Sequence, residues 1–200
     1  LLDFSGMDVK FDYGVTAIDV VDWTGDGDLD VLIGTTWLES YWPRAEKHVV
    51  AEADFNEALK LRYDEKGQWR GGKLDGWVYL FKNEGTNQKP HFKEPVMLKT
   101  AEGEPIQGSW YAPAVWALKA VDLDKDGDLD LICGGWMTWV DYFENVGTRQ
   151  RPSFVHRGRV LSKDGIPLEF PQLYLSPSLV TWNNRPGIIF GSDGGYLFYT

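Results

Sequence analysis

Cysteine is nearly absent from this sequence, which has a single one, Cys133, in 200 residues. One thiol excludes an internal disulfide framework and a thiolate metal site. Long hydrophobic runs are also missing: no stretch reaches the roughly 18 consecutive apolar residues of a membrane helix, so we expect no insertion into a membrane. The first residues, LLDFSGMDVKFDYG, lack a basic start followed by an apolar run and a cleavage site. No signal peptide is therefore visible, which is also what a processed chain would show.

Positive charge is scarce as well. The chain has 20 Lys and Arg against 30 Asp and Glu, a formal net charge of -10. This balance argues against nucleic acid and anionic membranes as partners, because a phosphate-binding surface needs clustered Lys and Arg. No G-x-S-x-G, H-E-x-x-H, Walker or dinucleotide-binding fingerprint occurs, so these catalytic classes lose support. With 43% apolar and 25% charged residues, the composition is typical of a globular protein.

What the sequence does have is an internal repeat. Residues 15–34, VTAIDVVDWTGDGDLDVLIG, match residues 115–134, VWALKAVDLDKDGDLDLICG, without a gap at an offset of 100. A second pair, FKNEGTNQKPHF from Phe81 and FENVGTRQRPSF from Phe143, matches at an offset of 62. The two offsets differ by 38 residues, which predicts an insertion of about that length in the first copy.

A third, partial copy lies at residues 180–199, where the acidic loop is two residues shorter and has lost its carboxylates. The repeat divides the chain into six parts: 1–14, the end of a preceding blade or a linker; 15–98, a first blade with an insertion at about 37–75; 99–114, a connection; 115–161, a second blade; 162–177, a connection; and 178–200, a partial third blade.

Each full copy predicts four short antiparallel strands. The first strand is expected at residues 15–21 and 115–121, and the second at the short apolar runs DVLIGTT and DLICGG. The third is expected where WVYLFKNEG and WVDYFENVG alternate between apolar and polar residues before an Asn-x-Gly turn. A fourth strand is expected near EPVML and GRVL. Repeated four-stranded units favour an all-β fold, a β-propeller, over a solenoid or a sandwich. Two and a half blades make an incomplete ring, since propellers close with about 4 to 8. We expect a longer chain to supply the others; several chains sharing a ring are the alternative.

The acidic loops predict two Ca²⁺ sites. In DLDKDGDLD, carboxylates stand at positions 1, 3, 5, 7 and 9 around Gly127, and such alternating hard oxygen ligands suit Ca²⁺, which also removes their repulsion. Position 7 is expected to ligate through its carbonyl, and the second loop to bind more tightly because Thr24 replaces an acid in the first. An EF-hand is rejected, since position 12 is Ile33 or Cys133 and a strand follows; a plain acidic turn is the alternative. The candidate ligands are Asp22, Thr24, Asp26, Asp28, Asp30, Asp122, Asp124, Asp126, Asp128 and Asp130.

These loops, each followed by YLFKNEGT or DYFENVGT and then by P-x-F, resemble the FG-GAP and VCBS repeats of integrin-like β-propellers and of many secreted bacterial proteins. The resemblance covers most of residues 15–200 apart from the insertion. It implies a ring of about seven blades, with Ca²⁺ between the first and second strands of a blade. The family uses this fold for adhesion, for carbohydrate binding and, in some larger proteins, for polysaccharide cleavage. The third copy has NNRPG in this loop, so we expect no ion there.

Aromatic residues predict a ligand-binding surface. The chain has ten Trp, and the topology of a blade would place the insertion and the inter-blade connections on the face opposite the acidic loops. Aromatic rings beside polar groups suit a sugar, although the same rings could simply pack long loops onto the ring of blades. The candidates for carbohydrate or another extracellular ligand are Trp37, Tyr41, Trp42, Trp69, Trp110, Trp136 and Trp139.

Two alternatives to simple carbohydrate binding are an enzyme and an adhesion module. A polysaccharide lyase needs a cation beside the uronate and a base, often His or Tyr, and the insertion offers Arg44, His48 and Tyr63 without diagnostic spacing. An integrin-like module would use the same face against a protein. All three fit a secreted, cell-surface or periplasmic protein, because Ca²⁺ loops of modest charge fill at the calcium concentration found outside cells.

Overall fold

The computed structural model describes residues 14–36, 76–107, 115, 117–134, 138–162, 164–171, 175–183, 185–195 and 197–199. Within these ranges the chain forms strands and turns and no helix. Among these residues there is accordingly no helix that could span a membrane. The strands are β1 Gly14–Val21, β2 Asp30–Thr36, β3 Val78–Phe81, β4 Val96–Met97, β5 Ala117–Val121, β6 Asp130–Gly134, β7 Val140–Asn145, β8 Phe154–Arg159, β9 Ser176–Trp182, β10 Arg185–Gly191 and β11 Leu197–Tyr199.

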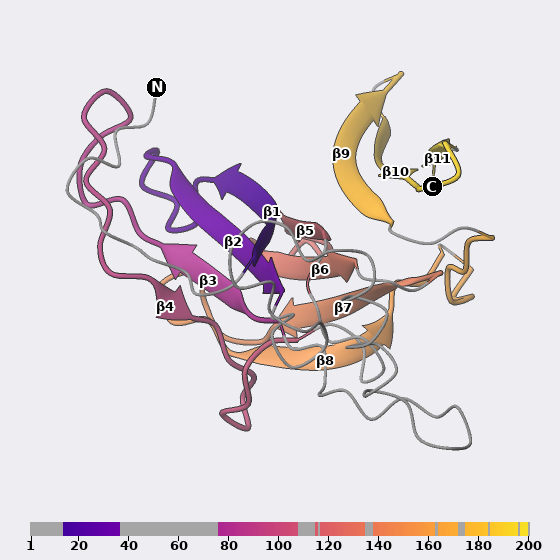
Figure 1. The fold of residues 1–200 in the computed structure, drawn as a ribbon, viewed down its shortest axis with the longest axis horizontal. Coiled ribbons are helices and arrows are strands. Elements are labelled where there is room, and N and C mark those ends of the chain that lie inside the picture. Colours follow the sequence, from indigo (N-terminus) through magenta and orange to yellow (C-terminus); the bar gives the residue numbers. More distant parts are fainter. Residues whose placement is uncertain are drawn as a thin grey trace, which may run out of the picture.

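The strands form three antiparallel sheets, each made of strands that are neighbours in the sequence (Figure 1). The first sheet has the order β1-β2-β3-β4, the second β5-β6-β7-β8, and the third β9-β10-β11. The prediction of an all-β fold with four antiparallel strands in each full copy is confirmed. The first two sheets are related by the repeat, since Val21 pairs with Asp30 and Val121 with Asp130 at the same place in each hairpin.

The fourth strand differs between the two copies. In the second sheet, β8 begins at Phe154 and pairs without interruption with Asn145, Glu144 and Phe143, so it starts earlier than GRVL indicates. In the first sheet the equivalent pairing begins with an isolated bridge between Asn83 and Phe92, and β4 itself has only two residues. Pro95 lies between the bridge and β4, and it has no N–H to donate to a neighbouring strand.

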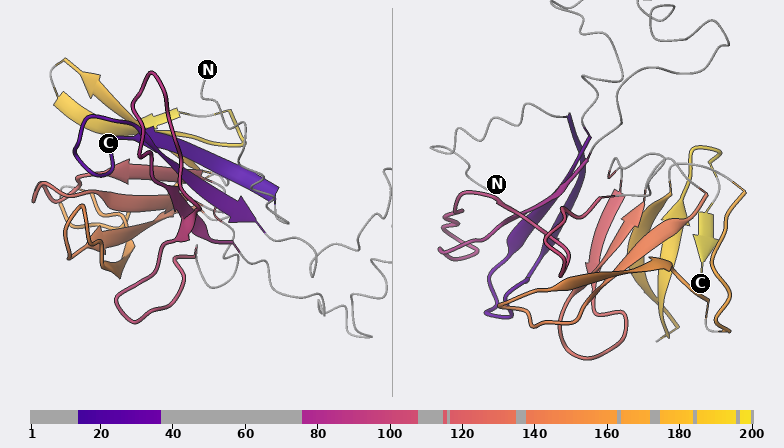
Figure 2. Two further views of the ribbon diagram at one scale, coloured as in Figure 1. Left: turned by 90° about the vertical axis from the view of Figure 1, so that its left-hand side faces the viewer. Right: turned by 90° about the horizontal axis from the view of Figure 1, so that it is seen from below.

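The sheets pack face to face in chain order, with the second between the first and the third (Figure 2). A first apolar cluster joins the first two sheets, and it includes Leu32 and Leu80 from one and Leu118 and Leu131 from the other. A second cluster joins the second and third sheets through Ile132, Val140, Ile188 and Phe190. The first strands of the sheets also contact one another, β1 with β5 and β5 with β9. The hydrophobic core is therefore distributed between sheets.

Close approach between sheets explains two glycines. A Cβ added to Gly34, within β2, would lie 2.7 Å from Cγ1 and 2.9 Å from the backbone oxygen of Val115, in the segment that leads to β5. A Cβ added to Gly134, at the end of β6, would collide with the backbone oxygen of Leu175, just before β9. Both glycines therefore let the next sheet pass against the second strand. Cys133, beside Gly134, is fully buried, and burial raises the pKa of its thiol well above the usual value.

Candidate metal centre

The second acidic loop, residues 122–129, joins β5 to β6. Lys125 and Gly127 both have positive φ, 69° and 100°, at loop positions 4 and 6. The first loop has the same two left-handed residues, Gly25 and Gly27, with φ of 77° and 92°. Gly adopts this conformation without strain, and Lys125 shows that the loop imposes it even where a side chain is present. The two loops therefore share the same left-handed backbone conformation at positions 4 and 6.

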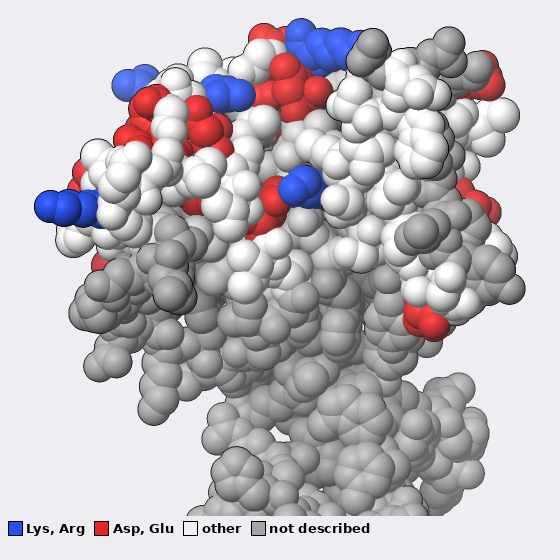
Figure 3. Space-filling model, turned by 90° about the horizontal axis from the view of Figure 1, so that it is seen from above, with Lys and Arg blue, Asp and Glu red and all other residues white. Residues whose placement is uncertain are grey.

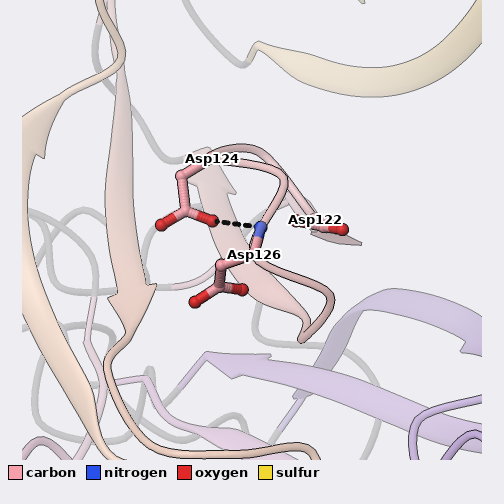
Figure 4. Close-up of side chains that lie close together, drawn as sticks. All are labelled: Asp122, Asp124 and Asp126. Carbon is pink, nitrogen blue, oxygen red and sulfur yellow. Dashed lines mark hydrogen bonds between the residues drawn. The ribbon is translucent and has the colours of Figure 1, made fainter.

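Three carboxylates of the second loop converge. Asp122, Asp124 and Asp126 each offer an oxygen, and these oxygens lie within 4.8 Å of one another. Figure 4 shows the three side chains around the loop, with the N–H of Asp126 donating to Asp124 Oδ1 at 3.2 Å. Because Ca²⁺ binds oxygen at about 2.3–2.6 Å, two ligands of one ion can be separated by this distance. The spacing therefore fits a common Ca²⁺.

Two carboxylate oxygens in this loop are buried without a hydrogen bond. They are Asp122 Oδ1 and Asp128 Oδ1. A buried oxygen that accepts no hydrogen bond has lost its contact with water without compensation, which costs free energy. A bound ion is one explanation for such an atom. Asp128 is only 7% exposed, and burial, followed by the charge of Asp126, raises its pKa to about 6. A divalent cation would satisfy both oxygens and offset the repulsion.

Asp130, at loop position 9, holds the loop to the sheet. It is fully buried, and it accepts hydrogen bonds from the N–H of Leu123 at 3.0 Å, the N–H of Asn145 at 2.8 Å and the hydroxyl of Tyr142 at 3.1 Å. Burial raises its pKa, and these donors oppose the shift. The carboxylate thus ties the loop to β7, and its role as a metal ligand stays a prediction.

The first loop has a different arrangement. Asp22 accepts three backbone N–H groups of its own loop, from Gly25 at 2.7 Å, Asp26 at 3.1 Å and Gly27 at 3.1 Å. The N–H of Asp28 donates to Asp26 and lowers the pKa of that carboxyl, and the N–H of Asp128 donates to Asp126 in the same way. Only the second loop, among the described residues, brings three acidic side chains together. A carboxylate cluster that could hold a metal ion, as predicted, is therefore present in one loop, and the binding of Ca²⁺ at either loop remains a prediction.

Asp30 repeats the role of Asp130. Its two oxygens accept the N–H of Trp23 at 3.1 Å and the N–H of Asn83 at 2.8 Å, and it is 1% exposed. As with Asp130, burial raises its pKa. Position 9 therefore has the same structural function in both copies, whether or not the loop gathers carboxylates.

The turn after the third strand supports each loop, which the sequence analysis did not anticipate. In the first sheet, Asn87 Nδ2 donates to the carbonyl of Gly27 at 2.9 Å. In the second, Arg149 Nε donates to the carbonyl of Gly127, also at 2.9 Å. Asn87 and Arg149 occupy the same place in the pair of segments that match at an offset of 62, so their alignment was the available signal. An open pocket of about 330 Å³ lies between residues 126–128 and 147–150.

The same turn also reaches the neighbouring repeat. Gln150 Nε2 donates to the backbone carbonyl of Thr24 in the first loop at 3.0 Å. Arg149 lies beside Gly25, where an added Cβ would be 2.8 Å from its guanidinium. On the face seen from above, acidic side chains gather in groups beside a few Lys and Arg side chains (Figure 3). The two acidic loops therefore share one supporting turn.

Of the predicted ligand-binding aromatics, only Trp139 lies within the described residues. It precedes β7, at the end of the second sheet opposite the acidic loop, and its role in binding a ligand stays a prediction. The Arg159 guanidinium lies 4.0 Å from the centre of its ring and pairs with Glu169. One face of Trp139 is therefore covered by a cation. The following predicted residues lie outside the described part of the chain: Trp37, Tyr41, Trp42, Arg44, His48, Tyr63, Trp69, Trp110 and Trp136.

Comparison with known proteins adds nothing to this site. No protein family, no curated protein and no solved structure matches the chain. The resemblance to FG-GAP and VCBS repeats therefore still depends on the loop and turn residues alone.

Proposed function

We propose that the protein binds Ca²⁺ in the second acidic loop, through Asp122, Asp124 and Asp126, and that the ion stabilises the hairpin of β5 and β6. The observation that carries this proposal is the pair of buried, unpartnered oxygens of Asp122 and Asp128 beside three converging carboxylates. Ca²⁺ would supply positive charge among these carboxylates. It also tolerates the irregular arrangement of oxygen ligands that a loop provides. The open pocket beside residues 126–128 leaves room for water ligands.

The first loop is proposed as a second, weaker Ca²⁺ site. It has the same glycines and the carboxylates of Asp22, Asp26 and Asp28, with Thr24 as a neutral ligand. An ion there competes with the three backbone N–H groups that Asp22 accepts in the loop, so ion contacts are gained in exchange for weaker hydrogen bonds. That exchange lowers the affinity, since each bond lost offsets part of the energy gained from the ion.

At the level of the whole protein, we propose a Ca²⁺-stabilised β-propeller, exported from the cell, that binds carbohydrate through the face opposite the acidic loops. Three observations support the propeller: consecutive antiparallel sheets, packing of each sheet on the next, and contact between the first strands of neighbouring sheets. The aromatic content of the insertion and connections supports carbohydrate binding. Screening on a glycan array tests it, and Trp42→Ala should weaken any sugar bound whereas Trp23→Phe, in the core, should not.

Calcium binding is tested by titration calorimetry and by luminescence of Tb³⁺, which replaces Ca²⁺. We expect the wild-type chain to bind at the second loop, and Asp124→Asn to weaken that binding by about tenfold or more, because ligand charge sets the affinity of Ca²⁺ loops. Asp164→Asn removes an exposed acid outside the loops and should change nothing. Equal binding by wild-type protein and the Asp124 variant would contradict the proposal.

Thermal unfolding gives an independent measurement. An ion that binds only the folded state raises its stability by about 2.7 kcal/mol at a concentration 100 times Kd. The midpoint should therefore rise with added CaCl₂ and fall when a chelator is added. A midpoint that does not respond to calcium would show that the acidic loop is only a turn.

A further inference from the structure

One turn of the second sheet contacts both acidic loops. This turn, residues 148–151, follows β7, and we call it the shared turn. The N–H of Thr148 donates to the carbonyl of Arg151 at 3.2 Å, and the N–H of Arg151 donates to the carbonyl and the hydroxyl of Thr148 at 3.0 and 3.1 Å. Arg149 and Gln150 are the two central residues of this closed turn, so their backbone positions are fixed together.

The shared turn is attached to the second acidic loop at two places. Arg149 Nε donates to the carbonyl of Gly127, at loop position 6, at 2.9 Å. Asn145, the last residue of β7, donates its N–H to Asp130 Oδ1 at 2.8 Å and accepts the N–H of Gly147 at 3.1 Å. A change in the backbone of the second loop is therefore transmitted to the shared turn.

The shared turn also holds the first acidic loop, at loop positions 3 and 4. Gln150 Nε2 donates to the carbonyl of Thr24 at 3.0 Å. The guanidinium of Arg149 lies beside Gly25, where an added Cβ would be 2.8 Å from Nη1. Thr24 is the neutral residue of the proposed first Ca²⁺ site, and its Oγ1 is buried and makes no hydrogen bond. The shared turn therefore fixes a residue that would surround the ion.

We propose that the two loops bind Ca²⁺ cooperatively through the shared turn, an inference that rests on the Ca²⁺ sites proposed above. An ion in the second loop fixes the backbone that holds Arg149, and the shared turn then holds Thr24 in place. Part of the ordering of the first loop is thus complete before its own ion arrives, so that ion binds more tightly. By linkage the effect is reciprocal. Repulsion between the two ions opposes it, but salt screens charges separated by more than about 8 Å at physiological ionic strength.

A titration with CaCl₂ followed by NMR tests the coupling. The N–H groups of Gly27 and Gly127 donate to Asp22 and Asp122, so their resonances report the two loops separately. In a double variant, Asp122→Asn with Asp124→Asn, the Gly127 resonance should no longer respond. We expect the first loop of this variant to bind Ca²⁺ about threefold to tenfold more weakly than in the wild type, which is the range that one hydrogen bond contributes.

Gln150→Met separates the shared turn from long-range charge. Methionine has a similar length but no amide donor, so with Gln150→Met already present the double variant should change the affinity of the first loop by less than about twofold. A purely electrostatic effect of the lost carboxylates would be the same with either residue. Gln88→Met is the matched control, because Gln88 holds the same place in the first copy, is exposed like Gln150, and donates to neither acidic loop in the described part of the chain. It should leave the full effect.

Two results would overturn the coupling: a first loop whose affinity does not depend on the second, or a dependence that Gln150→Met leaves intact. The coupling and the calcium sites fail in different ways. If neither glycine resonance responds to CaCl₂, the proposed sites themselves are wrong. If both respond independently of each other, the sites stand and only the coupling is wrong.

Discussion

Single residues at loop position 9 determine how the acidic loops join the sheets. Asp30 and Asp130 are buried, and each accepts backbone N–H groups from its own loop and from an asparagine at or just after the end of the third strand of its sheet. Carboxylates are seldom buried unless their oxygens are satisfied, because desolvation of the charge is costly. These two aspartates therefore hold each acidic loop to its sheet through hydrogen bonds, independently of any ion that the other aspartates bind.

Replacing Asp130 should destabilise the protein even without calcium. In Asp130→Ala the buried N–H groups of Leu123 and Asn145 lose their acceptor, and we expect a loss of about 2 to 4 kcal/mol in the free energy of unfolding. Tyr142→Phe removes only the hydroxyl donor and should cost about 1 kcal/mol. Urea denaturation in calcium-free buffer measures both. If the two variants lose the same stability, the backbone hydrogen bonds to Asp130 are not what holds the loop.

The raised pKa of Asp128 predicts how stability depends on pH in the absence of calcium. Its folded-state pKa of about 6 lies above the value of 3.8 for a free side chain, so the folded protein binds this proton more tightly than the unfolded chain does. The contribution to stability is complete below about pH 4 and is lost as the pH rises through 6. Asp128→Asn, which cannot ionise, should flatten this part of a melting profile in calcium-free buffer, and Asp164→Asn should leave it unchanged. A wild-type profile that is flat between pH 4 and 6 would contradict the prediction.

At the level of the element, the glycine that follows the apolar residues of each second strand sets how closely the next sheet approaches. Gly34 and Gly134 face the backbone of Val115 and Leu175, whereas no atom of the described residues lies within 4 Å of the Cβ position of Gly191. The residue is the same in all three copies, and its surroundings differ because only the first two strands have a described sheet after them.

Two alanine substitutions test this interpretation. Gly134→Ala should lower the free energy of unfolding by about 2 kcal/mol or more, because the methyl group meets backbone, which cannot move aside as a side chain can. Gly191→Ala should stay within about 0.5 kcal/mol, as open sites usually do. Thermal melts of dilute protein provide the comparison. Similar midpoints for the two variants would mean that the sheets have room to separate.

At the level of the whole molecule, one ion pair crosses between the first strands of two sheets. Lys119 Nζ lies 2.6 Å from Asp19 Oδ1, and the N–H of Ala120 donates to Asp19 Oδ2 at 2.8 Å. Asp19 is 5% exposed, so its charge depends on these partners. The two residues occupy the same place in the repeat, and the change from Asp to Lys makes that place complementary between neighbouring sheets.

A double-mutant cycle measures what this pair contributes. Asp19→Asn keeps an acceptor for Ala120, Lys119→Met keeps most of the side-chain volume, and the two together remove both charges. We expect Lys119→Met alone to cost about 2 kcal/mol or more, since it leaves a buried carboxylate without its cation, and a coupling energy of about 1 to 3 kcal/mol. Chemical denaturation of all four proteins gives the cycle. Additive effects would show that the sheets do not depend on the pair.

The strands were largely predictable from the sequence. Alternation and the matching segments predicted β1, β2, β3 and the equivalent strands of the second copy, because these positions repeat the same apolar pattern. The fourth strands were less predictable, since Pro95 shortens the pairing in one copy and the other copy continues from Phe154. The supporting role of Asn87 and Arg149 was not anticipated, because the residue type differs between the two copies. Both side chains nevertheless donate to the carbonyl of the glycine at loop position 6.

The sequence by itself determined the repeat, the strands and the place of the acidic loops, because these depend on local patterns of apolar residues, glycines and carboxylates. Only the tertiary structure decided which carboxylate oxygens of each loop accept hydrogen bonds and which do not. Asp22 and Asp122 hold the same loop position, yet Asp22 accepts three backbone N–H groups whereas Asp122 accepts one, from Gly127 to Oδ2, and its Oδ1 accepts none. The difference arises because Asp124, where the first loop has Thr24, takes the N–H of Asp126 and leaves the oxygen of Asp122 available to an ion.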